Sequence, residues 1–189
     1  MKLMLHSLLL ASLVLGSAHS AVLAGETPWI DGISLSLGAG DDPGNLDLYR
    51  IEMQKRWHNS WFKGGAWYLG GFWETGLTSL QTGVPNKTNV VALSLTPVLR
   101  YQRDARLSSG LTPFAEAGVG LHLLSDTWVG ENDLSTVLQL GALLGLGLGF
   151  GDRGQYELSY RYTHLTNADI KQPNDGLEMH MVKLGYNFN

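Results

Sequence analysis

The sequence predicts an all-β protein, an eight-stranded antiparallel transmembrane β-barrel, and three observations carry this prediction. The N-terminus has the pattern of an export signal, and the rest of the chain divides into short segments in which apolar and polar side chains alternate. The polar rows consist largely of glycine, hydroxyl and charged residues. Because successive side chains of a strand point to opposite faces, each segment has one apolar and one polar face. A small membrane barrel turns the apolar faces outward and packs the polar ones inside.

The first 24 residues have the features of a secretory signal peptide. Lys2 precedes an apolar run over 8–16, and small residues follow up to Val22-Leu23-Ala24. The run is too short for a membrane-spanning helix, which needs about 20 apolar residues. We expect cleavage after Ala24, with Ser20 as the second choice, and one mature outer-membrane barrel domain over 25–189.

The strands are expected from this alternation and from their length, since a tilted membrane strand takes about 9–11 residues. In the first, Leu35 and Leu37 alternate with Ser34 and Ser36. The predicted strands are 29–39, 46–57, 65–76, 89–102, 112–124, 136–150, 154–166 and 177–188.

The connections are predicted to alternate in length. Long ones are expected at 76–88 and 125–135, and short ones at 103–111 and 151–153. Long loops of such barrels face outside the cell, which also places the 167–176 connection outside.

Aromatic residues and composition favour a bacterial outer-membrane barrel over a soluble periplasmic lipid-binding barrel. Membrane barrels carry aromatic girdles at both interfaces. The aromatic residues expected near strand ends are Trp29, Trp57, Trp61, Trp67, Trp73, Trp128, Tyr101 and Tyr186. A net charge of -4 argues against a nucleic-acid partner, and the absence of cysteine excludes disulfides and thiolate metal sites.

Charged side chains of the polar rows balance in sign and are expected to pair inside the barrel, because unpaired burial is costly. The predicted interior charges are Arg50, Glu52, Arg56, Glu74, Arg100, Glu116, Glu157 and Arg161. Eight strands enclose an interior that side chains fill, so a transport function is not expected.

The last predicted hairpin carries a candidate catalytic site. His164 and Thr166 share the apolar, outward face of their strand, and antiparallel pairing of Thr166 near Gly176 sets His164 opposite Glu178. Glu178 can then hold the imidazole, which takes the proton of the Thr166 hydroxyl for attack on an acyl carbon. Asn167, Asn174 and nearby loop amides are candidate oxyanion donors and substrate-positioning groups.

A non-catalytic interpretation of these residues also stays open. A histidine, a hydroxyl and a carboxylate at a barrel rim also serve as interfacial hydrogen-bonding groups, and His180 on the same face is interpreted in this way. We expect no metal and no cofactor, because the sequence has no His/Cys cluster and no phosphate-binding loop.

Two segments of this hairpin resemble the lipid A 3-O-deacylase family, the PagL-type outer-membrane acyl hydrolases. They are His164-Leu165-Thr166-Asn167-Ala168 and Lys171-Gln172-Pro173-Asn174-Asp175-Gly176-Leu177-Glu178. The resemblance implies an eight-stranded barrel that removes the ester-linked hydroxyacyl chain at position 3 of lipid A. It implies that His164, Thr166 and Glu178 are catalytic, with Thr166 in place of the family's usual serine.

The expected partner is therefore lipid A of lipopolysaccharide in the outer leaflet of the membrane. The alternative function is a non-catalytic outer-membrane barrel with a structural or lipopolysaccharide-binding role, and homodimer formation is left open.

Overall fold

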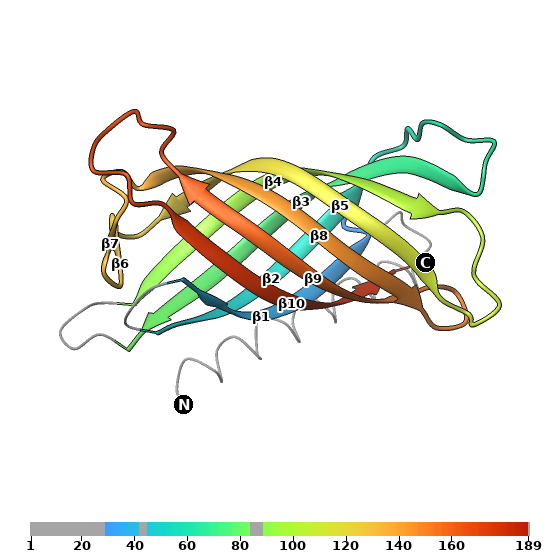
Figure 1. The fold of residues 1–189 in the computed structure, drawn as a ribbon. Helices are drawn as coiled ribbons and strands as arrows, with labels where there is room; N and C mark the ends of the chain where they lie inside the picture. Colours follow the sequence, from blue (N-terminus) through green and yellow to red (C-terminus); the bar gives the residue numbers. More distant parts are fainter. Residues whose placement is uncertain (1–28, 42–44, 84–88, 189) are drawn as a thin grey trace.

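The computed structural model describes residues 29–41, 45–83 and 89–188, and these form a closed antiparallel barrel (Figure 1). The order of neighbouring strands is β1-β10-β9-β8-β5-β4-β3-β2, and a separate two-stranded hairpin is formed by β6 and β7. The strands are β1 (Gly32–Gly40), β2 (Leu46–Arg56), β3 (Trp67–Thr82), β4 (Val90–Arg103), β5 (Thr112–Leu124), β6 (Trp128–Val129), β7 (Asn132–Asp133), β8 (Leu138–Phe150), β9 (Tyr156–Thr166) and β10 (Leu177–Asn187). The predicted eight-stranded barrel is confirmed, while the predicted signal peptide lies outside the described residues.

The predicted end of the third strand was wrong. β3 continues to Thr82 and pairs with β4 as far as Leu80 opposite Val90, so the connection expected over 76–88 is much shorter. Leu77 is exposed and Leu80 is buried, so the alternation that defines this strand continues through the segment that was assigned to a loop. The 57–66 connection is as long as the 167–176 connection, and loop length therefore distinguishes the two ends of the barrel less sharply than expected.

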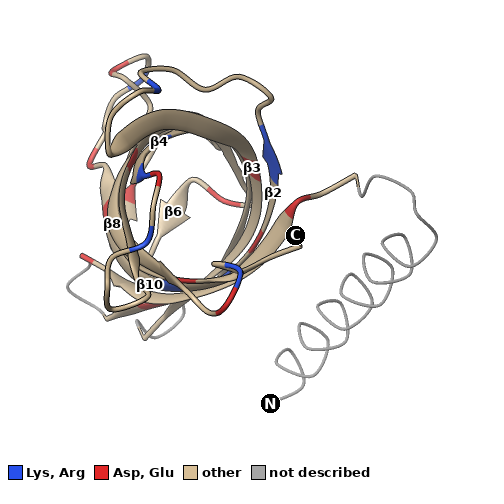
Figure 2. Ribbon diagram, turned by 90° about the vertical axis from the view of Figure 1, so that its right-hand side faces the viewer, with Lys and Arg blue, Asp and Glu red and all other residues tan. Residues whose placement is uncertain are grey.

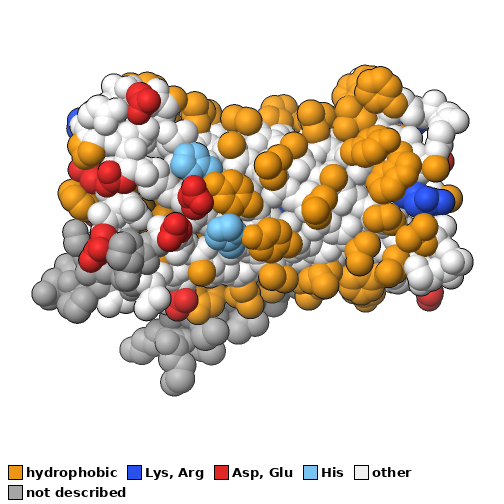
Figure 3. All heavy atoms as spheres, viewed as in Figure 1, with side chains coloured by type: hydrophobic (Ala, Val, Ile, Leu, Met, Phe, Trp, Pro, Cys, Tyr) orange, Lys and Arg blue, Asp and Glu red, His pale blue; other side chains and the backbone are white. Residues whose placement is uncertain are grey.

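The outer wall is apolar over most of its height (Figure 3). Leucine and valine side chains that would be buried in a soluble protein are about half exposed. They include Leu35, Leu37, Leu93, Leu95, Leu121, Leu123, Leu144, Leu146, Leu158, Val182 and Leu184. A wall of this kind is the lipid-facing surface of a transmembrane barrel. None of the described residues forms a helix that is long and apolar enough to cross a membrane.

Paired charges fill the middle of the barrel. Figure 2 shows the barrel end-on, as a closed ring of strands. Glu74 is fully buried and lies 2.8 Å from Arg161 Nη1 and 2.9 Å from Lys183 Nζ. Arg161 Nε also donates to Glu116 at 2.9 Å, and Arg100 donates to Glu157 at 2.8 Å. Eight charged side chains are buried among the described residues, four cationic and four anionic: Arg50, Arg100, Arg161, Lys183, Glu52, Glu74, Glu116 and Glu157.

The predicted network was wrong at one position. Arg56 is exposed, because β2 ends at this residue and its side chain leaves the interior. Lys183 of β10, which was not predicted, supplies the fourth buried cation.

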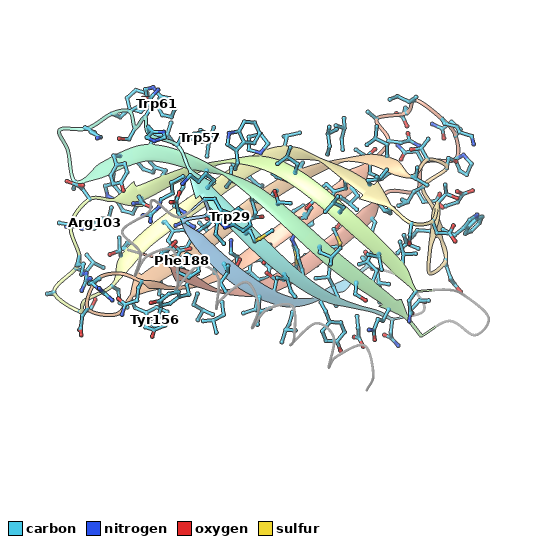
Figure 4. The ribbon with its side chains drawn as sticks, turned by 180° about the vertical axis from the view of Figure 1, so that it is seen from behind. Trp29, Trp57, Trp61, Arg103, Tyr156 and Phe188 are labelled. Atoms are coloured by element: carbon cyan, nitrogen blue, oxygen red, sulfur yellow. The ribbon has the colours of Figure 1, made fainter. Side chains whose placement is uncertain are left out.

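The two ends of the barrel differ in their side chains. At the terminal end, defined by the C-terminus and the 57–66, 104–111 and 151–155 connections, aromatic rings cluster at the rim (Figure 4). Trp57 packs edge-on against Trp61 and Trp73, and Trp67 stacks on Tyr101. This is the expected girdle, although Trp128 lies at the opposite end, in β6.

The other end, called the site end, is defined by β6, β7 and the 167–176 connection. Here the interior is apolar rather than charged. Val129 and Leu134 from the 125–137 segment are fully buried, together with inward-facing side chains of the strands. The 125–137 segment therefore folds onto the barrel and closes its mouth.

Candidate active site

The β9–β10 hairpin has the register that the sequence predicted. Leu165 pairs with Leu177 and His164 pairs with Glu178, and both members of the second pair face outward. Leu165 and Leu177 point inward and are fully buried in the apolar core of the site end. This buried pair fixes the register, since a shift by one residue would move both leucines to the outer face.

His164 and Glu178 lie close together without a hydrogen bond between them. The distance from His164 Nδ1 to Glu178 Oε1 is 4.0 Å, and the side chains are 39% and 47% exposed. His164 Nδ1 is itself shielded and meets no hydrogen-bond partner among the described residues. Catalytic hydrogen bonds are often long before substrate binds, so a separation of 4.0 Å is compatible with a catalytic pair.

The neighbours of His164 leave its ring accessible from the membrane side. Ala142 of β8 pairs with His164 from the other flank and is exposed. Gly176 precedes β10 with φ +72°, and its missing side chain leaves room for the ring. The imidazole is therefore enclosed by small residues rather than packed into a core.

The Thr166 hydroxyl ends the same outward row, two residues after His164. Its Oγ1 accepts hydrogen bonds from Asn174 Nδ2 at 2.9 Å and from the backbone N–H of Ala168 at 3.1 Å. Two donors therefore converge on the oxygen that would attack an acyl carbon. One is a side-chain amide and the other a backbone N–H, the kinds of donor from which oxyanion holes are built.

The two asparagines proposed from the sequence occupy different environments. Asn174 lies beside Thr166, and its Oδ1 also accepts the backbone N–H of Asn167 at 3.1 Å. The Asn167 side chain is buried and donates to the carbonyls of Leu134 at 2.9 Å and Lys171 at 2.7 Å. Asn174 is thus placed to act on Thr166, whereas the amide hydrogens of Asn167 hold the loop together.

Support of this loop by the 125–137 segment was not predicted from the sequence. Asp133 N donates to Asp175 Oδ2 at 2.8 Å, and Asp175 N donates to Asp133 O at 3.3 Å. Together with the bond from Asn167 to Leu134, these contacts attach the residues around Thr166 and Asn174 to β7. The local signal for a hairpin was Gly130, which takes φ +59° in the tight turn between β6 and β7.

The site is a cluster of polar groups on an apolar wall. Figure 3 shows histidine and carboxylate side chains together near the site end, with hydrophobic side chains over the remaining wall. The described residues contain no group of three or more histidine, cysteine or carboxylate side chains that could hold a metal ion. Acid–base and nucleophilic groups are what these residues offer to a bound lipid.

Comparison with known proteins identifies the family. The family model described as lipid A 3-O-deacylase (PagL) matches residues 47–187, which span β2 to β10. The chain is 32% identical over 150 residues to the lipid A deacylase PagL of Pseudomonas aeruginosa, covering 79% of this chain and 82% of that one. It is 28% identical over 172 residues to the lipid A deacylase PagL of Bordetella bronchiseptica, covering 90% of this chain and 91% of that one.

Comparison with solved structures supports the same family and the same fold. The crystal structure of the outer membrane enzyme PagL superimposes with a TM-score of 0.75 at 29% identity, covering 83% of this chain and 99% of that one. Neisserial surface protein A superimposes with a TM-score of 0.52 at 12% identity, covering 83% of this chain and 95% of that one, a likeness of fold alone. The apolar wall and the likeness to an outer-membrane enzyme place this barrel in the bacterial outer membrane. By sequence and by fold, the chain belongs to the lipid A 3-O-deacylase (PagL) family.

Proposed function

We propose that this protein is an outer-membrane lipid A 3-O-deacylase that hydrolyses the ester-linked hydroxyacyl chain at position 3 of lipid A. The main observation in support of this proposal is the position of the Thr166 hydroxyl on the lipid-facing wall. Thr166 Oγ1 lies on the same strand face as His164, which is paired with Glu178, and two donors converge on it. Family membership gives the substrate class.

The proposed reaction begins with substrate in the outer leaflet, its 3-linked ester against the wall at the site end. His164 accepts the proton of Thr166, and Thr166 Oγ1 forms a bond to the ester carbonyl carbon. The carbonyl oxygen becomes an oxyanion, stabilised by Asn174 Nδ2 and the Ala168 N–H. Collapse of this intermediate breaks the ester bond, and His164 returns its proton to the sugar oxygen that leaves.

Water then completes the cycle. The acyl chain is now an ester of Thr166, and a water molecule, deprotonated by His164, attacks the same carbonyl carbon. The bond to Thr166 Oγ1 breaks, Oγ1 recovers a proton from His164, and the hydroxy fatty acid is released. Glu178 orients the imidazole and stabilises its cationic form in both halves of the cycle.

Thr166 in place of serine is the feature that sets the expected rate. The additional methyl group restricts χ1 and occupies space next to the attacking oxygen. A misplacement of about 1 Å can reduce a rate by about 100-fold. We therefore propose a functional but slow nucleophile, which Thr166→Ser should accelerate.

The test is mass spectrometry of lipid A from Gram-negative cells that express the wild-type chain, Thr166→Ala or Thr166→Ser. Heat-modifiable migration on a gel confirms that each variant is folded. Loss of one hydroxyacyl chain with wild type and Thr166→Ser, but not with Thr166→Ala, supports the proposal. Unchanged lipid A with all three folded proteins would favour the non-catalytic barrel.

A homodimer gains no support from the family or from the described residues, and we do not propose one.

A further inference from the structure

Three aromatic side chains on the wall beside the site have no part in the proposed mechanism. Tyr160 and Tyr162 precede His164 on the outward face of β9, and His180 follows Glu178 on the outward face of β10. His180 pairs with Tyr162 across the hairpin, and their ring centroids are 5.3 Å apart. On the other side, Tyr160 Oη and His180 Nδ1 share a hydrogen bond of 2.6 Å.

Tyr162 reaches the catalytic carboxylate. It lies diagonally across the hairpin from Glu178, since Glu178 pairs with His164 and His180 pairs with Tyr162. Diagonal neighbours in an antiparallel pair are within reach of long side chains. This register sets the Tyr162 side chain beside the Glu178 carboxylate, close enough for the two groups to interact. Glu178 therefore has His164 directly opposite, with Nδ1 at 4.0 Å from Oε1, and Tyr162 on the diagonal.

An exposed glutamate in this position needs a second partner. Glu178 is 47% exposed and makes no hydrogen bond to His164 at 4.0 Å, so His164 alone does not fix its rotamer. A carboxylate has two oxygens and can accept from two donors at once. A hydrogen bond from Tyr162 to one oxygen leaves the other for the imidazole.

We propose that Tyr162 is a positioning residue for the reaction, which holds the Glu178 carboxylate in line with His164. The ring of Tyr162 also packs against His180, with ring centroids 5.3 Å apart. Tyr162 acts in this way without touching the reacting atoms. The inference rests on the proposed function.

Removal of one hydroxyl tests the inference. Tyr162→Phe keeps the ring against His180 and removes only the hydroxyl that is proposed to hold Glu178. For the purified barrel acting on lipid A in detergent micelles, kcat should fall about tenfold, the order expected for a hydrogen bond to a charged group. KM should stay within about twofold, because Tyr162 acts on the transition state and not on substrate binding.

The matched control is Tyr160→Phe. It also removes a tyrosine hydroxyl from the outward face of β9, two residues away, but this hydroxyl bonds to His180 and not to Glu178. We expect kcat within about twofold of wild type, because the contact of Tyr162 with Glu178 remains. An equal loss of kcat in both variants would point to general damage to the wall and would overturn the inference.

A double-mutant cycle shows whether Tyr162 acts through Glu178. In a Glu178→Gln background, Tyr162→Phe should change kcat by less than about twofold, because coupled residues are not additive. A further tenfold loss in that background, or wild-type kcat in Tyr162→Phe alone, overturns the inference while leaving the deacylase intact. Absence of fatty acid release from both the wild-type and Thr166→Ser chains would remove the proposed function, and the inference with it.

Discussion

The imidazole of His164 lies against the backbone of Gly176. A Cβ atom built on Gly176 would be 3.0 Å from His164 Cε1 and 3.5 Å from His164 Nε2. The glycine also has φ +72°, which side chains rarely adopt. The position of the candidate base therefore depends on a residue with no side chain at the start of β10.

Gly176→Ala should reduce activity more than stability. The methyl group pushes the His164 ring by a few tenths of an ångström or more, and catalytic rates fall steeply with such shifts, by about 100-fold for 1 Å. The positive φ adds roughly 1–2 kcal/mol of strain. Release of fatty acid from lipid A and the unfolding temperature of the barrel measure the two effects.

Gly110→Ala is the control for this variant. Gly110 has φ +80°, and a Cβ built there meets no described atom within 4 Å. It lies in the 104–111 connection at the terminal end, far from the site. Similar strain and unchanged activity are expected, and equal activity losses in the two variants would refute a direct effect on His164.

Asn174→Asp should abolish most of the activity. The variant loses both side-chain donors, including the one to Thr166 Oγ1, but keeps an oxygen to accept the Asn167 N–H. Removal of one oxyanion donor typically costs about 100- to 1,000-fold in kcat. Steady-state kinetics on lipid A would show the loss in kcat, and wild-type kcat would exclude the donor role.

Asn167→Asp should affect the loop itself. Its buried amide donates to the carbonyls of Leu134 and Lys171, and the variant loses both bonds. An unsatisfied buried group costs about 1–3 kcal/mol. Limited proteolysis of the 167–176 connection should therefore be faster in Asn167→Asp than in the wild-type chain. Equal rates would show that Asn167 does not hold the loop.

Glu74→Gln should destabilise the barrel strongly. Glu74 is fully buried and faces Arg161, Lys183 and Arg50, whose charges would lose their shared partner. Breaking a buried pair costs about 3–5 kcal/mol. The temperature at which the folded form converts to the unfolded form on a gel should drop.

Lys55→Gln is the matched control for Glu74→Gln. It breaks a partly exposed pair with Asp31 at 3.2 Å. Exposed pairs contribute about 0–1 kcal/mol, so little change is expected. If Glu74→Gln unfolds at the same temperature as Lys55→Gln, the interior network contributes no more than a surface pair.

The barrel should show no stable channel conductance in a planar bilayer. A polar cavity of about 430 Å³ opens at the terminal end, but Arg100 and Glu157 lie at its inner boundary. Paired charges fill the middle of the barrel, and the apolar cluster with Val129 and Leu134 closes the site end. Steady single-channel currents with the wild-type protein would contradict this arrangement.

The parts of the fold that were predictable from sequence follow from strict alternation. A period of two places His164 and Thr166 on the outer face and Arg161 on the inner face without reference to other strands. Antiparallel pairing after a short connection then sets His164 opposite Glu178. Both predictions depend on local geometry and were confirmed.

The remaining features depend on contacts between distant segments. The attachment of Asn167 to Leu134 joins residues on different hairpins, so nothing near either residue indicates it. The exposure of Arg56 and the burial of Lys183 depend on where each strand ends relative to the barrel rim. Alternation assigns a face to a side chain but does not give its height in the barrel.

The inward-facing side chains of β9 affect the assembly of the barrel in the membrane. If β9 paired one residue out of register, Arg161 would face lipid and His164 would enter the lumen. An arginine in the middle of the lipid-facing wall costs about 2–4 kcal/mol, so such a barrel would insert poorly. A misassembled chain would then both insert poorly and lack an outward-facing His164 for catalysis. Deacylation of lipid A would thus report on correct barrel assembly in the cell.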